Sequence, residues 1–272
     1  MLGTTLQRAL SSHEIFPLSK QSCDITNPKK VHSVLSELRP DVVIHCAAMT
    51  AVDQCEIDQR RAWIVNAFGT SNIASATNKI GAKLIAISTD YVFDGNMDRP
   101  YHEFDIPEGV SCLYGMTKRV AENMVRTNCP NHIILRTAWL YGGEGPSFVH
   151  TMLKLSARKA FPIRVVNDQI GNPTSTLVLS NILNSLLDYP EIVGTIHATC
   201  EGEASWFDFA KEIFGILNLK KEVQPCSSLE YPTIAKRPKN SRLEKMVLHE
   251  LGIIEIPNWQ NALSTFLKDY KI

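Results

Sequence analysis

Short apolar segments alternate with segments of helical pattern along the first half of this 272-residue chain, and no other feature restricts its fold as much. The segments 41–48, 83–88 and 132–136 are expected to be strands, and helices are expected at 58–79 and 114–127. Successive apolar residues are typical of strands that are covered on both faces, as in a parallel sheet. The alternation therefore predicts an α/β fold with a doubly wound parallel sheet of the Rossmann type.

The amino-terminal part adds a weaker strand and a helix to this pattern. Residues 14–18 are expected to form a short strand. Asn27 and Pro28 are expected to begin a helix, because Asn caps helices well and Pro is favoured in the first turn. Apolar residues at positions 31, 34, 35 and 38 recur at helical spacing and predict its buried face.

The first residues look like the end of a glycine-rich cofactor-binding motif. A dinucleotide-binding sheet normally begins with a strand and a Gly-x-x-Gly-x-x-Gly turn that opens the first helix. In this chain Gly3 would be the last glycine of that motif, and the first strand and the earlier glycines do not precede it. We therefore expect an N-terminally truncated sheet, either in a chain that starts upstream or in a damaged or repurposed relative.

The pattern loosens after Tyr141, where a glycine-rich loop at 142–146 begins. The sequence predicts a dinucleotide-binding domain at 1–145. A smaller, mixed α/β domain, mainly substrate-binding, is predicted at 146–272, folded over the carboxyl edge of the sheet and interleaved with returns to it. Its expected strands are 163–166 and 195–198, and its expected helices are 147–159, 176–187, 206–217 and 258–269.

Composition argues against several kinds of partner and compartment. The 28 basic and 28 acidic residues balance, so nothing favours a nucleic acid or a membrane surface. No apolar run approaches the roughly 18 residues of a membrane-spanning helix, and the first residues do not resemble a signal peptide. The seven cysteines are scattered without a Cys-x-x-Cys pair, and the histidines show no metal-ligand spacing. We expect reduced thiols, a cytoplasmic location and no metal site.

Three side chains predict the chemistry. Tyr114 and Lys118 lie four residues apart on an expected helix and therefore share one face. Thr89 follows an expected buried strand, whose end can meet that face. The group fits proton transfer to an oxygen beside a nicotinamide, with Tyr114 as general acid, Lys118 favouring its phenolate and Thr89 orienting a carbonyl. The alternative for Tyr114 and Lys118 is a surface pair without function.

Seven motifs then give a specific resemblance. These motifs are CDIT at 23–26, AAMTAVD at 47–53, STDYVFDG at 88–95, YGMTK at 114–118, RTAWLYG at 136–142, DQIGNPT at 168–174 and RPKNS at 237–241. With them, the chain resembles the dTDP-4-dehydrorhamnose reductases, which are extended short-chain dehydrogenase/reductases, along its whole length. Each motif is weak alone, but all seven occur in the order and spacing of that family.

The resemblance implies reduction of the 4-keto group of a dTDP-4-dehydro-6-deoxy sugar by NADPH or NADH, in cell-surface polysaccharide synthesis. It implies catalytic roles for Thr89, Tyr114 and Lys118. The implied cofactor-binding residues are Gly3, Asp24, Ile25, Ala47, Ala48 and Thr50, with Tyr114 and Lys118 at the nicotinamide end. The implied substrate-binding residues are Thr89, Asp90, Trp139 and Arg237. Lys20, at the expected end of the second strand, stands where a carboxylate would select NADH and so favours NADPH.

Each of these positions also has a structural alternative. Asp24 fits a turn before the helix at Asn27, the alanines fit tight packing, Trp139 fits a core position and Arg237 fits a surface cation in a proline turn. For the whole chain, the alternative is a non-catalytic regulatory subunit of the same fold, like the beta subunit of methionine adenosyltransferase. A nucleotide sugar is the expected partner, and the sequence specifies neither a Mg²⁺ site nor a homodimer.

Overall fold

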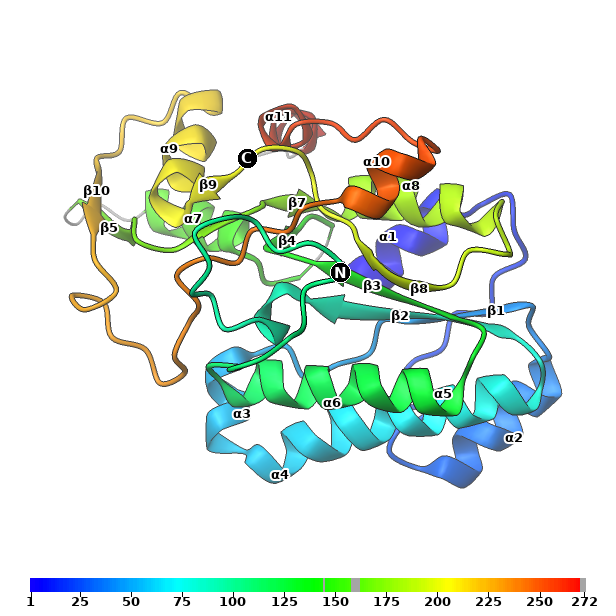
Figure 1. Cartoon of the computed structure of the whole chain (residues 1–272). Coiled ribbons are helices and arrows are strands. Elements are labelled where there is room, and N and C mark those ends of the chain that lie inside the picture. The colour runs from blue at the N-terminus through cyan, green and yellow to red at the C-terminus, as the bar shows by residue number, and fades with distance from the viewer. Residues whose placement is uncertain (144, 158–161, 270–272) are drawn as a thin grey trace.

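The central sheet has four parallel strands in the order β1-β2-β3-β8. The computed structural model describes residues 1–143, 145–157 and 162–269. The strands are β1 Val42–His45, β2 Lys83–Thr89, β3 His132–Thr137 and β8 Gly194–His197. Helices cover both faces of this sheet (Figure 1), which confirms the expected doubly wound α/β fold.

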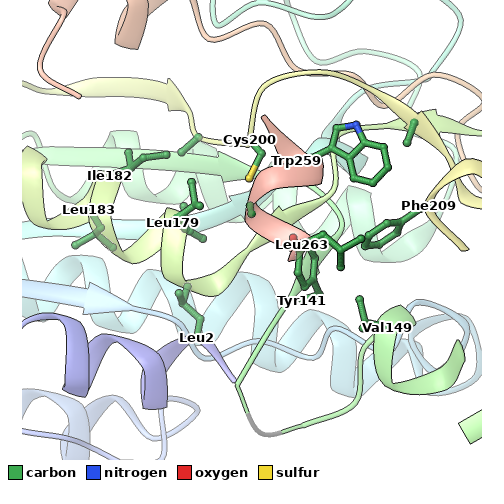
Figure 2. Close-up of a cluster of buried hydrophobic side chains, with 14 of the residues drawn as sticks. Leu2, Tyr141, Val149, Leu179, Ile182, Leu183, Cys200, Phe209, Trp259 and Leu263 are labelled. Atoms are coloured by element: carbon green, nitrogen blue, oxygen red, sulfur yellow. The ribbon is translucent and has the colours of Figure 1, made fainter. Parts of the chain in front are cut away.

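Alternating side chains of the central strands point to opposite faces of the sheet and pack in two separate hydrophobic cores. Ile85 and Ile133 pack in the larger core, together with Leu179. Leu84 and Ile134 point to the opposite face and join a smaller core. Figure 2 shows part of the larger core. The larger core lies against α1 (Leu2–Ala9) and α8 (Thr176–Leu187), and the smaller one against α2 (Pro28–Leu38), α5 (Thr70–Lys79) and α6 (Leu113–Asn128).

The long helix expected at 58–79 is present but is not uniform. It begins as α4 (Gln59–Ala62), continues as a π-helix over Trp63–Gly69 and ends as α5. A separate short helix, α3 (Val52–Ile57), precedes it. A π-helical turn widens the helix by one residue and is frequent at functional sites. Here it carries the buried Asn66, whose contacts are part of the site described below.

The strand expected at 14–18 is wrong. Residues 14–19 form no helix or strand in the described part of the chain, and β1 pairs only with β2 there. Phe16 and Leu18 remain 44% and 46% exposed. Apolar and β-branched residues favour a strand only where a neighbouring strand supplies hydrogen bonds, and sequence alone does not reveal that neighbour.

The second half of the chain builds short strand pairs beyond the carboxyl ends of the central strands (Figure 1). Its remaining elements are β4 Leu140–Tyr141, α7 Phe148–Ser156, β5 Ile163–Val166, β6 Ile170–Gly171, β7 Thr174–Ser175, β9 Ala204–Ser205, α9 Trp206–Ile216, β10 Val223–Cys226, α10 Met246–Leu251 and α11 Trp259–Asp269. The expected end of the 147–159 helix lies outside the described residues. The domain division at 145/146 stays a prediction. No helix within the described ranges is long and apolar enough to cross a membrane.

Candidate active site

The site lies where the carboxyl end of β2 meets the first turn of α6. A short 3₁₀ turn, Asp90–Val92, follows β2 directly. Gly115 permits the close approach of the helix, because a Cβ atom there would lie 2.1 Å from the carbonyl oxygen of Tyr91. The backbone N–H of Leu113 at the start of α6 donates to Glu56 at 2.7 Å. These two contacts hold the first turn of α6 against α3 and against the 3₁₀ turn that follows β2.

Thr89, Tyr114 and Lys118 are all buried at this corner. The ring of Tyr91 contacts that of Tyr114 edge to face, with centroids 5.7 Å apart. The Lys118 ammonium donates to the carbonyl oxygen of Ile87 in β2 at 2.8 Å. Thr89 lies close enough for its hydroxyl to lower the pKa of Tyr114. The three residues singled out from the sequence are therefore neighbours.

Burial controls the protonation of the two ionisable members of this group. It raises the pKa of the Tyr114 phenol, and the nearby Asp90 adds to that effect. Burial also lowers the pKa of Lys118 to about 8, against the attraction of Glu122. We expected Lys118 to lower the pKa of Tyr114, but burial raises this pKa, and Lys118 is not among the main groups that act on it. Tyr114 is consequently protonated at neutral pH, as a proton donor must be.

Asp90 is a buried carboxyl group that forms no ion pair with any described residue. Its Oδ1 accepts a hydrogen bond from the Thr89 hydroxyl at 2.8 Å, and Thr89 in turn accepts one from the backbone N–H of Tyr91. Its Oδ2 is buried without a hydrogen-bond partner among the described residues. Burial raises the pKa of Asp90 to about 6, although the Ser241 and Thr89 hydroxyls oppose this. A buried polar atom that lacks a hydrogen-bond partner in the protein is suited to bind a ligand.

A second buried carboxylate, which we did not select from the sequence, lies one turn beyond Lys118. Glu122 accepts hydrogen bonds from Arg136 in β3 at 2.8 and 2.7 Å and from the Ser88 hydroxyl at 2.7 Å. Arg126 adds a further bond at 3.1 Å. This network ties α6 to β2 and β3 one turn beyond Lys118. The signal in the sequence was an arginine inside an otherwise apolar strand, opposite a helix whose buried face carries a glutamate.

Asn66 joins the loop after β1 to the same helix. Its side chain accepts from the N–H of Met49 at 2.7 Å and donates to the carbonyl of Met49 and to the Thr117 hydroxyl, both at 3.1 Å. Thr117 precedes Lys118. The π-helical turn therefore fixes the shape of the loop that holds the expected cofactor-contacting alanines.

The residues expected to contact the cofactor differ in how exposed they are and in the contacts that they make. Ala47 and Thr50 are exposed beyond the end of β1, and Ala48 is half-buried. Asp24 accepts hydrogen bonds from the backbone and hydroxyl of Thr26, so it has the turn role that we considered for it. Ile25 packs against the π-helical turn, where a Cβ on Gly69 would lie 2.8 Å from its side chain. Gly3 lies in the first turn of α1, with open space around it.

The two expected substrate residues from later motifs already have partners. The Trp139 indole stacks on Trp206 with centroids 3.5 Å apart, and its N–H donates to Ser241 at 3.2 Å. Gly171 permits this packing, since a Cβ there would lie 2.5 Å from the indole. Arg237 pairs with Asp53 at 3.1 Å. Trp139 is therefore half-buried, and Arg237 is held by a carboxylate.

The residues present fit a nicotinamide dinucleotide. Lys118 uses one of the three N–H bonds of its ammonium on Ile87, and the other two have no partner in the described part of the chain. The ammonium lies within electrostatic reach of His45 and Cys46 at the end of β1, directly before the expected cofactor-contacting alanines, and free N–H donors there suit ribose hydroxyls. Within residues 1–143, 145–157 and 162–269, no group of three or more His, Cys, Asp or Glu side chains could hold a metal ion.

Comparisons with known proteins agree on one family. Residues 1–272 match the family model described as RmlD substrate binding domain. The chain is 37% identical to dTDP-4-dehydrorhamnose reductase of Salmonella typhimurium, and 36% identical to the spore coat polysaccharide biosynthesis protein SpsK of Bacillus subtilis. Each match covers 98% of this chain and 94% of the relative. The crystal structure of dTDP-4-dehydrorhamnose reductase from Bacillus anthracis in complex with NADP has a TM-score of 0.95 at 40% identity, over 99% of this chain and 95% of that one.

Proposed function

The chain belongs to the RmlD substrate-binding-domain family, and from this premise we propose that it reduces dTDP-4-dehydrorhamnose to dTDP-L-rhamnose with NADPH. The similar proteins from Salmonella and B. anthracis bear the name of that reductase, and the latter was crystallised with NADP. The similar B. subtilis protein is named for polysaccharide biosynthesis. We therefore assign the reaction to the synthesis of cell-surface polysaccharide.

One observation carries the proposal: a protonated, buried phenol lies beside a strand-end hydroxyl, with an ammonium one turn further along the helix. These are the groups that reduction of a ketone requires from a protein. NADPH, when bound, supplies the hydride for the carbonyl carbon. The protein supplies the proton, the orientation of the carbonyl and the exclusion of water.

Each of the three residues has a separate role in this mechanism. Tyr114 donates its phenolic proton to the carbonyl oxygen of the sugar as that oxygen gains charge. Lys118, with a pKa of about 8, is mostly protonated at neutral pH and stabilises the phenolate that remains. Thr89 orients the carbonyl oxygen, and its own direction is set by the hydrogen bond to Asp90.

We assign the remaining contacts by their place around this centre. Lys118 holds the nicotinamide ribose, Ala47, Ala48 and Thr50 allow close approach of the cofactor, and Asp24 and Ile25 lie at the adenine. Gly3 is assigned to the diphosphate at the start of α1. Asp90 and Trp139 contact the sugar, and Arg237 contacts the diphosphate of the substrate from its position against Asp53.

The wider setting follows from the same groups. We place the protein in the cytoplasm, because all seven cysteines are free thiols. The nucleotide sugar is the partner, and no nucleic acid or membrane enters the mechanism. A homodimer is compatible with the proposed mechanism. The mechanism does not require one, because every group that we assign comes from a single chain.

The test is NADPH oxidation with dTDP-4-dehydrorhamnose, measured for the wild type and for Tyr114→Phe. We expect the variant to lose about 10²–10⁴-fold in kcat, with NADPH affinity retained in a fluorescence titration. Tyr91→Phe is the matched control, because Tyr91 packs against Tyr114 without a hydrogen-bonded hydroxyl in the described structure. Undiminished turnover in Tyr114→Phe would remove this residue as the acid. A wild type that binds both ligands without turnover would support the regulatory alternative.

A further inference from the structure

A basic pocket lies apart from the proposed catalytic group, since none of Thr89, Tyr114 and Lys118 lines it. Its volume is about 320 Å³. The loop after residue 19 forms one wall, and the beginning of the α4 and π-helical segment forms the other. The lining residues are Lys20, Thr26, Asp58, Arg60, Arg61, Ile64 and Val65.

The charge in this pocket is unbalanced. Lys20, Arg60 and Arg61 are exposed, and none has an ion-pair or hydrogen-bond partner for its side chain among the described residues. Asp58 is the single carboxylate in the lining, and its Oδ1 accepts the backbone N–H of Arg61 at 3.1 Å as the cap of α4. Three cations therefore face one carboxylate that is already engaged with the helix end. Such a surface attracts a multiply charged anion.

The pocket adjoins the place proposed for the adenosine. Thr26, in its wall, donates its hydroxyl to Asp24 at 2.8 Å. Lys20 lies close enough to Asp24 to help lower the pKa of that carboxyl group, although hydrogen bonds from Thr26 are the main cause. Ile25, between Asp24 and Thr26, packs against the same π-helical turn that carries Ile64 and Val65. A ribose next to Asp24 and Ile25 would direct its 2′ substituent toward these cations.

We propose that Lys20, Arg60 and Arg61 form the binding site for the 2′-phosphate of NADPH, and that the two arginines determine the preference for NADPH over NADH. This inference rests on the proposed function for its cofactor. The planar guanidinium binds a phosphate through paired, charge-assisted hydrogen bonds, and the 2′-phosphate is the part that NADH lacks. The apolar side chains of Ile64 and Val65 form the floor against which the adenosine packs.

The test uses only the adenosine half of the cofactor, so it does not depend on catalysis. Binding of 2′,5′-ADP and of 5′-AMP is measured by calorimetry for the wild type and for the double variant Arg60→Gln/Arg61→Gln. We expect the wild type to prefer 2′,5′-ADP by about tenfold or more. The double variant should lose most of that preference while its affinity for 5′-AMP stays the same. Added salt should weaken 2′,5′-ADP binding in the wild type far more than in the variant.

The matched control is Lys79→Gln, which removes an exposed cation from the other end of the same helical segment, roughly 28 Å from Arg60 at the rise of an α-helix. This control should keep the wild-type preference. Equal preference in the wild type and the double variant, or no preference in either, would overturn the inference. If the preference depends on the arginines but no sugar is reduced, the inference stands and the proposed reaction fails. If the sugar is reduced while the arginines leave the preference unchanged, only the inference fails.

Discussion

Glu122 and Asp90 are two carboxyl groups close to the proposed catalytic residues. Glu122 lies one turn beyond Lys118, Asp90 follows Thr89, and each is only 2% exposed. Their pKa values nevertheless move in opposite directions. Burial alone would raise the pKa of Glu122, but hydrogen bonds and charge from Arg136, with smaller contributions from Ser88 and Arg126, bring it below its ordinary value. Burial raises the pKa of Asp90 to about 6, because only hydroxyl and backbone groups oppose it.

The difference separates a group that holds the fold from a group that is available to a ligand. Every oxygen of Glu122 has partners, and those partners come from β2, β3 and α6. Asp90 has one oxygen with no hydrogen-bond partner among the residues that the structure describes, and it lies where we propose that the sugar binds. A protein retains a strained or unsatisfied buried polar group mainly where function requires it.

The largest effect is expected from breaking the Glu122 network. In Glu122→Leu, the guanidinium of Arg136 stays buried without its partner, and we expect a loss of about 3–5 kcal/mol, out of a total stability of about 5–15 kcal/mol. Urea unfolding followed by circular dichroism measures the change. A loss below about 1 kcal/mol would show that Arg136 finds another partner.

A second variant separates the ion pair from simple loss of packing. In Glu122→Leu/Arg136→Met both charges are removed together, and replacing a whole buried pair by apolar residues is often neutral. We expect the double variant to recover at least half of the stability that the single variant loses. A double variant as unstable as the single one would assign the loss to packing.

The pH dependence of stability distinguishes the two carboxyl groups directly. Because the pKa of Asp90 is raised in the folded state, the contribution of Asp90 to the free energy of unfolding is fully present below its pKa in the unfolded chain, about 4. This contribution is lost as pH rises through about 6. The expected loss is on the order of 2–3 kcal/mol. The lowered pKa of Glu122 has the opposite sign, since its contribution is present above the unfolded value and is lost as pH falls through the folded value.

Asp90→Asn tests this prediction, because an amide keeps the acceptor for Thr89 but does not titrate. Between pH 4.5 and 7.5, the urea midpoint of the wild type should decline with rising pH, relative to that of the variant. The midpoint of the variant should stay nearly level. Asp188→Asn, at an exposed position after α8, is the control and should follow the wild type. Parallel profiles for the wild type and Asp90→Asn would mean that Asp90 is ionised throughout.

The sequence predicted the parts of this corner that depend on local pattern. The strands before Thr89 and Arg136 are apolar over their length, and Tyr114 and Lys118 are related by helical spacing, so their places could be deduced. The role of Gly115 could not, because it depends on a backbone carbonyl from another element. The π-helical turn at Asn66 could not be predicted either, because the extra residue in such a turn does not change the amino-acid composition of the helix. The strand expected at 14–18 failed because its pairing partner is not encoded in the segment itself.

The smallest effect is expected at a third carboxylate, Asp53, which is 37% exposed. Its hydrogen bond to Arg237 is the main reason that its pKa is lowered, and it also accepts the N–H of Ala235 at 2.9 Å. Ala235 is buried in the same cluster as Tyr114, 182 residues away from Asp53 in the chain. Asp53 therefore holds the loop that carries Ala235 and Arg237 against the cluster of Tyr114, through an interaction that water and salt screen.

In Asp53→Ala we expect a stability loss below about 1 kcal/mol, as for exposed ion pairs. The KM for the nucleotide sugar should rise several-fold while kcat stays close to that of the wild type, because the loop and Arg237 are less well placed but Tyr114 is untouched. High salt should reduce the difference in KM. Arg164→Gln breaks an exposed pair with Glu230, outside the groups assigned to the catalytic corner, and should leave KM unchanged. A large fall in kcat for Asp53→Ala would contradict this prediction and would mean that Asp53, like Glu122, supports the proposed catalytic residues. An exposed ion pair that only holds a loop in place should not affect the rate of proton transfer.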